Sequence, residues 1–333
     1  MSFQKFNLHP ILLEAISTAG YEAPTLVQNR TIPIVLDGKD VITSAQTGTG
    51  KTAAFAIPIL QRLIASNIPS KKTKKIKALI ISPTRELAIQ IGKNFKAYGK
   101  HSKIRSAVIY GGTEIDPQKE ILSKGLDILV ATPGRLLDLH KQDLINLDYI
   151  ETLVIDEADL MLAMGFIDDV KKIERLCPEA KQTLLFSATI PYRIEQLASS
   201  ILINPERIEV GPVHAAASLV DQLLFYVPKR YKIPLCLHLL QKTITGQILI
   251  FRRTKYGVDK LNERLLKEGF KVERLHGNRK QNERQKALAD FKRNRVTILI
   301  ATDVAARGLD VDDIRLVVNF DFPKEMESYV HRM

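Results

Sequence analysis

The sequence predicts an α/β fold built as two parallel-sheet domains in tandem. Three observations support this prediction. First, 333 residues are more than one ordinary hydrophobic core needs and suit two domains of usual size. Second, short β-branched runs alternate with segments of helical period, which is typical of parallel strands joined by crossover helices. Third, a stretch of small residues, Gly and Pro interrupts the pattern at 208–218.

This break separates two sets of expected strands. We therefore expect a first domain (1–207), a linker (208–218) and a second domain (219–333). In the first domain they are expected at 40–43, 78–81, 107–110, 127–130, 152–155 and 183–186. In the second domain they are expected at 223–227, 248–251, 271–275, 297–301 and 316–320.

Composition limits the classes of protein. Apolar residues make up 45% and charged residues 26%, so neither a disordered chain nor a coiled coil is expected. The formal net charge of +12 favours a polyanionic partner, either nucleic acid or an anionic membrane surface. Residues 1–210 carry 26 basic and 23 acidic side chains and residues 211–333 carry 23 and 14, so most of the excess lies in the second domain.

The cysteine content and the apolar runs indicate a cellular location. Only Cys177 and Cys236 occur, far apart and without a nearby histidine in metal-ligand spacing, so neither a disulfide framework nor a zinc site is supported. The N-terminal segment does not have the pattern of a signal peptide, and no apolar run reaches membrane-spanning length. We therefore expect a cytoplasmic protein without a membrane partner. A monomer is also expected.

A glycine-rich segment lies between the first expected strand and a helical stretch. Its glycines let backbone N–H groups converge on phosphates, Lys51 can reach the β- and γ-phosphates, and Thr52 can ligate Mg²⁺. The general phosphate-loop pattern has Gly where this chain has Ala45, so the match is to a variant, and a chance turn is the alternative. The expected nucleotide-binding residues here are Ala45, Gln46, Thr47, Gly48, Thr49, Gly50, Lys51 and Thr52.

Carboxylates follow the strand expected at 152–155. Such groups are costly at the end of a buried strand unless they engage a metal, a reacting proton or partners. Asp156 is expected to hold Mg²⁺ together with Thr52, and Glu157 to orient or deprotonate the attacking water, which implies hydrolysis. An acidic helix cap is the alternative reading.

Together with the string Asp-Glu-Ala-Asp at 156–159, these residues resemble the DEAD-box RNA helicases of superfamily 2. Further motifs occur in that family's order, and the strings at 2–3 and 253–257 resemble its bacterial RhlE-type branch. The matching segments are 20–28, 83–88, 111–112, 132–135, 187–189, 301–310 and 329–332.

The resemblance implies two RecA-like domains that bind ATP, Mg²⁺ and RNA and use ATP hydrolysis to unwind RNA locally. Gln28 would read the adenine edge, and Tyr21 would stack on the ring, although a core aromatic is the alternative for Tyr21. Phe3 would mainly support this loop by packing. Arg307 would reach the γ-phosphate and Asp310 the ribose, whereas Asp159, Ser187 and Thr189 would couple the nucleotide to RNA.

The RNA contacts implied by the resemblance are mostly to phosphates, so little sequence preference is expected. They are Pro83, Thr84, Arg85, Gly112, Thr132, Pro133, Gly134, Arg135, Arg253, His276, Gly277, Gln281, Arg284, Thr302 and Asp303. His276 taken alone is more often a structural histidine. Strand alternation would send Arg252 and Arg253 to opposite faces, so one of them is expected to meet RNA.

One departure from the family pattern bears on activity. The family motif continues with two further arginines, whereas this sequence ends at Tyr329-Val-His-Arg-Met333. We therefore expect the second domain to be C-terminally truncated, and this form to bind ATP but to hydrolyse it poorly. An ATP-gated RNA clamp uses the same motifs and stays an alternative. A P-loop kinase or GTPase would need an acceptor pocket or a guanine-reading string, and the sequence has no such string. Partners in ribosome assembly or RNA decay are possible, but the sequence does not identify them.

Overall fold

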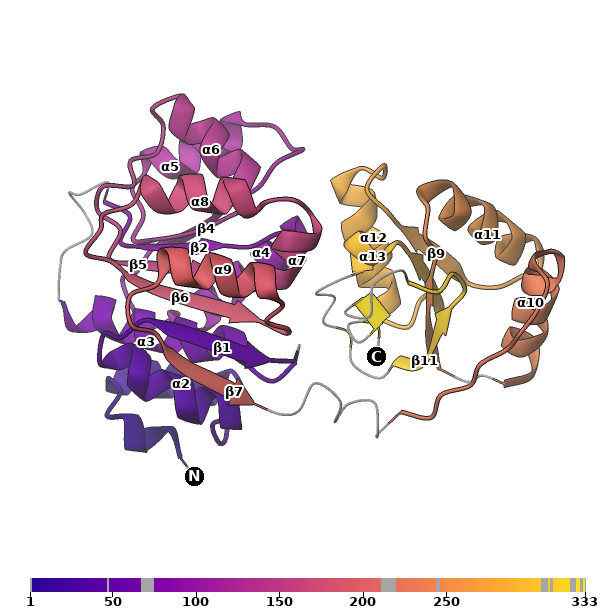
Figure 1. Cartoon of the computed structure of the whole chain (residues 1–333), viewed down its shortest axis with the longest axis horizontal. Coiled ribbons are helices and arrows are strands. Elements are labelled where there is room, and N and C mark those ends of the chain that lie inside the picture. Colours follow the sequence, from indigo (N-terminus) through magenta and orange to yellow (C-terminus); the bar gives the residue numbers. More distant parts are fainter. Residues whose placement is uncertain are drawn as a thin grey trace. The chain divides into compact units, whose positions relative to one another are not determined.

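The computed structural model describes residues 2–46, 48–66, 75–210, 220–243, 246–306, 311, 314–323, 328–329 and 332. The chain divides into two units, Met1–Gly211 and Pro212–Met333, each built around its own sheet (Figure 1). The two-domain, parallel-sheet prediction is confirmed, since every pair of neighbouring strands in both sheets runs parallel.

The first unit contains a seven-stranded sheet in the order β3-β4-β2-β5-β6-β1-β7. Its strands are β1 Val41–Ala45, β2 Ala78–Ile81, β3 Ser106–Ile109, β4 Ile128–Ala131, β5 Thr152–Ile155, β6 Gln182–Ser187 and β7 Glu206–Val210. Its helical segments are η1 Phe3–Phe6, α1 Pro10–Thr18, α2 Leu26–Leu36, α3 Lys51–Ala65, α4 Arg85–Tyr98, α5 Asp116–Ser123, α6 Pro133–Lys141, α7 Ala158–Ala163, α8 Ile167–Arg175 and α9 Tyr192–Ile201.

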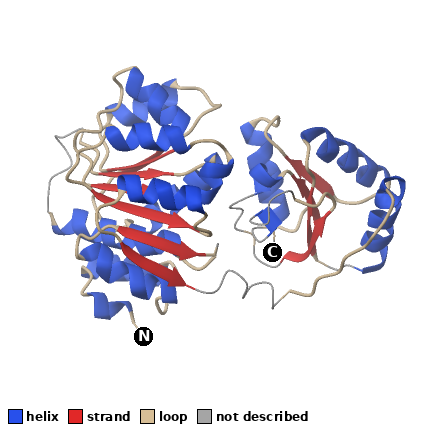
Figure 2. Ribbon diagram, viewed as in Figure 1, coloured by secondary structure: helices blue, strands red, loops and turns tan. Residues whose placement is uncertain are grey.

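Both faces of this sheet are covered by helices (Figure 2). On one face, Leu79 and Ile81 pack in a core with residues of α5 to α9. On the other face, Ala78 and Ile80 pack with residues of η1 and α1 to α4. Successive strand residues point to opposite faces, so a strand buried on both sides must be apolar throughout, which explains the unbroken apolar runs.

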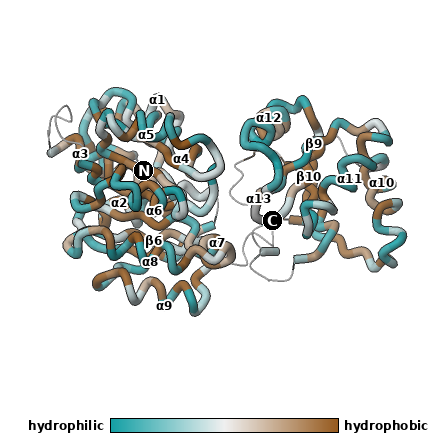
Figure 3. Tube along the Cα trace, turned by 90° about the horizontal axis from the view of Figure 1, so that it is seen from above, coloured by the Kyte–Doolittle hydropathy of each residue, from teal (hydrophilic) through white to brown (hydrophobic). Residues whose placement is uncertain are grey.

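The second unit contains a four-stranded sheet in the order β11-β8-β10-β9. Its strands are β8 Gln247–Phe251, β9 Val272–Leu275, β10 Ile298–Ala301 and β11 Ile314–Asn319. Its helical segments are η3 Lys229–Tyr231, α10 Lys232–Thr243, α11 Lys255–Lys267, α12 Gln281–Lys292 and α13 Asp303–Ala306. Helices α11 and α12 carry both hydrophilic and hydrophobic colours, as expected for helices with one buried stripe (Figure 3).

Two expectations about secondary structure are wrong. The segment 223–227 was expected to be a strand, but it pairs with no strand in the described part of the chain, and Leu223 and Tyr226 are 84% and 93% exposed. An apolar run forms a strand only where a neighbour offers backbone partners, and local pattern cannot supply one. The linker was expected to start at residue 208, yet residues 208–210 belong to β7, which pairs with β1.

Candidate nucleotide and RNA site

The phosphate loop connects β1 to α3 at the carboxyl edge of the first sheet. Gly48 and Gly50 adopt left-handed backbone conformations, with φ of +82° and +91°, and Lys51 is the first residue of the 15-residue helix α3. Backbone N–H groups of a first helical turn lack helical partners and attract anions. The loop therefore has the geometry that phosphate binding requires.

Gln28 ties the segment 20–28 to this loop. Its side chain is fully buried, accepts a hydrogen bond from Thr25 N at 3.0 Å and donates one to the Gly50 carbonyl at 3.2 Å. The first contact closes a capping box that starts α2. In this conformation the amide supports the phosphate loop, so reading an adenine edge would require the side chain to move.

Tyr21 packs as an aromatic residue of the core. Its hydroxyl lies 2.7 Å from that of Tyr98, and its ring meets Phe3 and Tyr98 edge to face. Phe3 is 4% exposed, so it supports this segment by packing, as expected. Stacking of Tyr21 on a nucleotide stays a prediction.

A buried charge cluster lies beside the phosphate loop, where β1 and β5 end. Lys51 Nζ lies 2.8 Å from Glu157 Oε1, and both side chains are less than 8% exposed. The ammonium is thus paired with a carboxylate, and an ammonium has three N–H donors, so it can still donate to a ligand. Glu157 has a φ of 55°, a strained conformation for a residue with a side chain, and such strain is frequent at functional sites.

The pKa values of Asp156 and Lys51 are both raised, but for different reasons. Burial, and next the charge of Glu157, raise the pKa of Asp156 to about 7, although Lys51 acts against this shift. Burial alone would lower the pKa of Lys51, but Glu157 and Asp156 more than offset it, so the pKa is raised above its usual value. The site therefore holds a permanent cation beside a carboxylate that titrates near neutral pH.

The residues at this position fit a magnesium ion shared with a nucleotide. Asp156 Oδ1 is buried and has no hydrogen-bond partner in the described part of the chain, so a ligand is needed to satisfy it. No group of three or more described His, Cys, Asp or Glu residues forms a metal site. An ion here would consequently take most of its ligands from phosphates and water, as Mg²⁺ usually does.

The coupling residues are brought together between β6 and α7. Asp159 Oδ2 accepts hydrogen bonds from Thr189 N and Thr189 Oγ1, both at 3.0 Å. Ser187 Oγ accepts a hydrogen bond from Asp159 N at 3.1 Å and donates one to the Thr189 carbonyl at 2.7 Å. A movement of the segment 156–159 would therefore break these hydrogen bonds or shift the loop after β6.

The expected RNA residues of the first unit follow β2, β3 and β4, which are neighbours in the sheet. Gly112 has a φ of +72°, and a Cβ there would lie 1.8 Å from an Arg85 nitrogen, so only glycine lets this guanidinium sit so close. Arg135 donates a hydrogen bond to the Thr113 carbonyl at 2.9 Å. The expected nucleotide residues of this edge follow β1 and β5, and the coupling residues follow β6, which lies between them. The nucleotide and RNA groups therefore occupy adjacent halves of one sheet edge.

In the second unit, the expected RNA residues again follow strands, but they differ in accessibility. Arg253 is exposed and Thr302 half-buried, whereas the ring of His276 is buried and its Nε2 lies 3.0 Å from Asp259 Oδ1. His276 therefore makes a structural contact here, and its contact with RNA stays a prediction. Gln281 and Arg284 in the first turn of α12 are largely buried too.

The structure leaves three expected residues undescribed, and it adds two residues that the sequence did not indicate. Thr47, Arg307 and Asp310 lie outside the described residues. Asp321 and Arg332 received no role from the sequence, although they join the loops after β8, β10 and β11. Arg332 lies in a recognisable motif, but nothing in the sequence indicates that Asp321 is its neighbour.

A cavity of about 500 Å³ lies away from all these residues. Its lining includes Phe95, Gly99, Ser106 and Ile128, near the end of α4 and the starts of β3 and β4. Because parallel strands share one direction, this is the opposite edge of the sheet. The cavity is separate from the nucleotide and RNA positions.

Comparison with known proteins gives consistent results. The model of the DEAD/DEAH box helicase family matches residues 25–197, and that of the helicase conserved C-terminal domain matches residues 231–333. The chain is 42% identical to the DEAD-box ATP-dependent RNA helicase CshA of Streptococcus pneumoniae serotype 4 over its full length, which spans 62% of that relative. It is 43% identical to CshA of Bacillus subtilis and spans 66% of it.

Among solved structures, Saccharomyces cerevisiae Dbp5 bound to RNA and ADP BeF3 matches with a TM-score of 0.88 at 31% identity, covering 99% of this chain and 85% of Dbp5. A DEAD box protein of Methanococcus jannaschii matches with a TM-score of 0.60 at 38% identity, covering 100% and 88%. The two units are therefore RecA-like domains, and the chain belongs to the DEAD-box helicase family.

Proposed function

We propose that the protein is an ATP-dependent RNA helicase that binds RNA duplexes and unwinds or remodels them locally, using ATP hydrolysis. The observation that carries this proposal is the shared sheet edge of the first unit. The expected nucleotide residues and the expected RNA residues follow neighbouring strands at this edge. Asp159 links the segment after β5 to the loop after β6. The names of the relatives support the same activity for the full-length proteins.

The residues of the nucleotide half would divide the work between binding and chemistry. Lys51 and the α3 N-terminus would hold the phosphates, and Glu157 would orient and deprotonate the attacking water. Thr52 and Asp156 would hold Mg²⁺, which would neutralise phosphate charge when bound. Arg307 and Asp310 would complete the site from the second unit, and Gln28 would select adenine after its side chain moves from the buried position described above.

Several finer expectations remain proposals. The relatives compared here are named CshA, so assignment to the RhlE-type branch rests only on short strings. No helix among the described residues is long and apolar enough to cross a membrane, and both cysteines are free and buried. Cytoplasmic location, a monomeric state, and partners in ribosome assembly or RNA decay are predictions from sequence alone.

Strand displacement tests the proposed function. A short labelled RNA duplex should be released with ATP and Mg²⁺, and release should fail with Glu157→Gln. Since slow turnover is expected for the 333-residue chain, ATP and RNA binding are measured in parallel. Failure to bind either ligand would refute the proposal, whereas stable RNA retention without displacement would favour the clamp.

Salt dependence tests how RNA is held. Contacts to phosphates release counterions, so the RNA affinity should fall steeply between low and physiological salt. An affinity that does not change with salt would show that the charge excess of +12 does not hold the RNA.

A further inference from the structure

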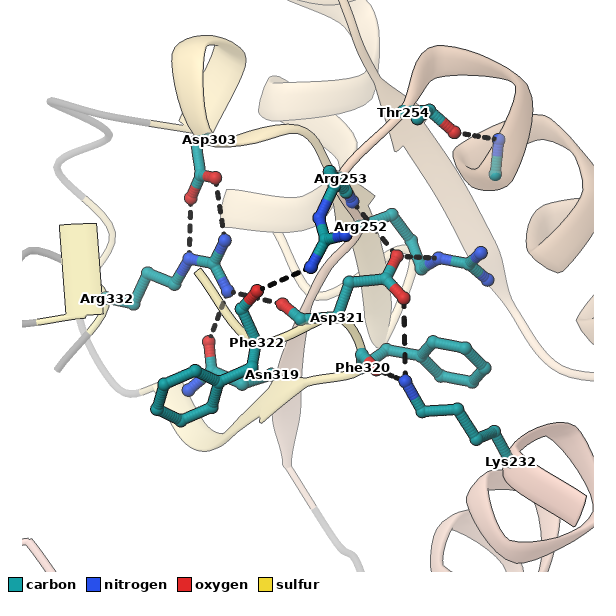
Figure 4. A network of polar contacts seen from close by, with 11 residues as sticks. Lys232, Arg252, Arg253, Thr254, Asp303, Asn319, Phe320, Asp321, Phe322 and Arg332 are labelled. Carbon is teal, nitrogen blue, oxygen red and sulfur yellow. Dashed lines mark hydrogen bonds and ion pairs between the residues drawn. The ribbon is translucent and has the colours of Figure 1, made fainter. Parts of the chain in front are cut away.

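We propose that Arg332 is a positioning residue that holds the RNA-contacting loops of the second unit in place through Asp303, rather than a residue that touches phosphate itself. This inference rests on the proposed function. Arg332 and Asp321 are the two nodes of a polar network that spans the carboxyl ends of three neighbouring strands (Figure 4).

The guanidinium of Arg332 donates hydrogen bonds to protein groups through all three of its nitrogens. Its Nε and Nη2 lie 2.5 and 2.7 Å from the two carboxylate oxygens of Asp303. Its Nη1 donates to Asn319 Oδ1 at 2.6 Å and to the Asp321 carbonyl at 3.0 Å. Of the five N–H donors of an arginine, about four are thus used inside the protein.

Burial strengthens this conclusion. The Arg332 side chain is only 3% exposed, and its guanidinium lies 4.6 Å from the centre of the Phe251 ring. Bidentate pairing fixes both the position and the plane of its partner carboxylate. An arginine held in this way is poorly placed to contact RNA, but well placed to orient the segment that starts at Thr302.

Asp321 is the second node. Its Oδ2 accepts hydrogen bonds from Arg252 Nε at 2.8 Å and from Arg253 N at 3.1 Å, and its Oδ1 lies 3.6 Å from Lys232 Nζ. Burial alone would raise the pKa of Asp321, but the Arg253 N–H and the Arg252 guanidinium outweigh it and lower the pKa. The carboxylate therefore stays ionised and holds the backbone of Arg253, whose own guanidinium donates to the Phe322 carbonyl at 3.1 Å.

The network gives Asp303 a role that differs from direct RNA contact. A carboxylate repels RNA phosphates, and here its charge is neutralised by Arg332. Beside these carboxylates, Arg253 and Thr302 can still meet RNA, because Arg253 is exposed, Thr302 is half-buried and neither carries negative charge. The positions of these two residues depend on Asp321 and on the Arg332–Asp303 pair, respectively.

The direction in which Asp303→Asn changes the RNA affinity distinguishes a positioning role from a purely electrostatic one. Asp303→Asn removes a negative charge near the expected RNA path, so electrostatics alone would strengthen RNA binding. If the pair positions the loop, Asp303→Asn should instead weaken binding about tenfold, within the range for residues acting through a packed network. Arg332→Gln should weaken it to a similar extent, and the double variant should be no weaker than the worse single variant.

The experiment measures binding of a labelled single-stranded RNA, with Mg²⁺ and a non-hydrolysable ATP analogue, by fluorescence anisotropy. Arg264→Gln is the matched control, because it removes the same charge from an exposed pair with Glu268 on α11. Nucleotide affinity and Tm are recorded for each variant. Nucleotide affinity should stay near wild type, whereas Arg332→Gln should lower Tm, because it leaves the Asp303 carboxylate without its partner; RNA binding is therefore measured well below the lowest Tm. Should Arg332→Gln fail to fold, Arg332→Lys carries the test, because it keeps the charge but loses the bidentate pair.

The possible binding results distinguish failure of this inference from failure of the proposed function. Binding by Asp303→Asn and Arg332→Gln that equals or exceeds that of Arg264→Gln would overturn this inference and leave the proposed function intact. Additive losses in the double variant would also overturn it, because they would indicate that Arg332 contacts RNA independently. Absence of RNA binding by the wild-type chain would overturn the proposed function itself.

Discussion

Gly50 permits a sharp test of how the segment 20–28 supports the phosphate loop. A Cβ at Gly50 would lie 2.3 Å from Gln28 Nε2, whereas a Cβ at Gly48 would meet nothing within 4 Å. Both glycines have similar left-handed φ values, +91° and +82°. Gly48→Ala therefore carries the backbone cost alone, and Gly50→Ala carries the same cost plus displacement of the Gln28 amide.

The structure sets the size of each effect. An alanine in the left-handed region costs about 1 to 2 kcal/mol, which is the expected loss for Gly48→Ala. Displacing Gln28 breaks its bonds to Thr25 N and the Gly50 carbonyl, each contributing about 1 kcal/mol. Gly50→Ala should thus lose roughly 2 kcal/mol more than Gly48→Ala, or about 4 to 8 °C in Tm for a unit of this size.

Thermal and urea unfolding of the chain without nucleotide measure these differences. In a Gln28→Ala background, Gly50→Ala should cost only what Gly48→Ala costs, because the clashing amide is gone. Equal destabilisation by the two glycine variants in the wild-type background would refute the proposed contact. So would a cost of Gly50→Ala that Gln28→Ala does not reduce.

Four further predictions concern the charge cluster and its link to the RNA loops. The pKa of Asp156 is raised to about 7 in the folded protein, whereas an aspartate in the unfolded chain ionises near pH 4. The free energy of unfolding should therefore fall as pH rises from about 4 to 7. Urea titrations should show a flatter pH dependence for Asp156→Asn. Binding of Mg²⁺ and ATP near pH 6.5 should also release a proton, seen as a buffer-dependent calorimetric enthalpy that Asp156→Asn removes. Lys51→Met leaves buried carboxylates uncompensated and should cost about 3 to 5 kcal/mol on unfolding. Thr189→Val removes one hydrogen bond to Asp159 and should reduce RNA stimulation of any ATPase activity while ATP affinity is retained.

The results that would contradict these predictions are equally specific. A stability that does not change between pH 4 and 7, or a binding enthalpy independent of buffer, would mean that Asp156 is ionised before ligands bind. Unfolding of Lys51→Met at the wild-type urea concentration would show that the ion pair with Glu157 is not needed for stability. Wild-type RNA stimulation in Thr189→Val would remove that hydroxyl from the coupling path.

Much of the fold and of the site was predictable from sequence because the signals are local. The apolar run of β2 and the alternation of strands with helices follow from burial on both faces of a parallel sheet. Likewise, the glycines at 48 and 50 precede a helix because only such residues let the chain turn there at low cost. Motif order then placed the candidate nucleotide and RNA residues at strand ends.

What the sequence could not decide depends on contacts between distant residues. The run at 223–227 looks like a strand, but pairing requires a partner strand, and β7 was missed because its partner β1 lies far away along the chain. His276 matched a motif, yet its burial beside Asp259 is a tertiary property. The sequence by itself determined the family, the parallel sheets and the residues of the phosphate loop. Only the tertiary structure decided that Gln28 contacts Gly50 and that Arg332 holds Asp303, because each of these contacts joins residues more than 20 positions apart whose approach depends on packing.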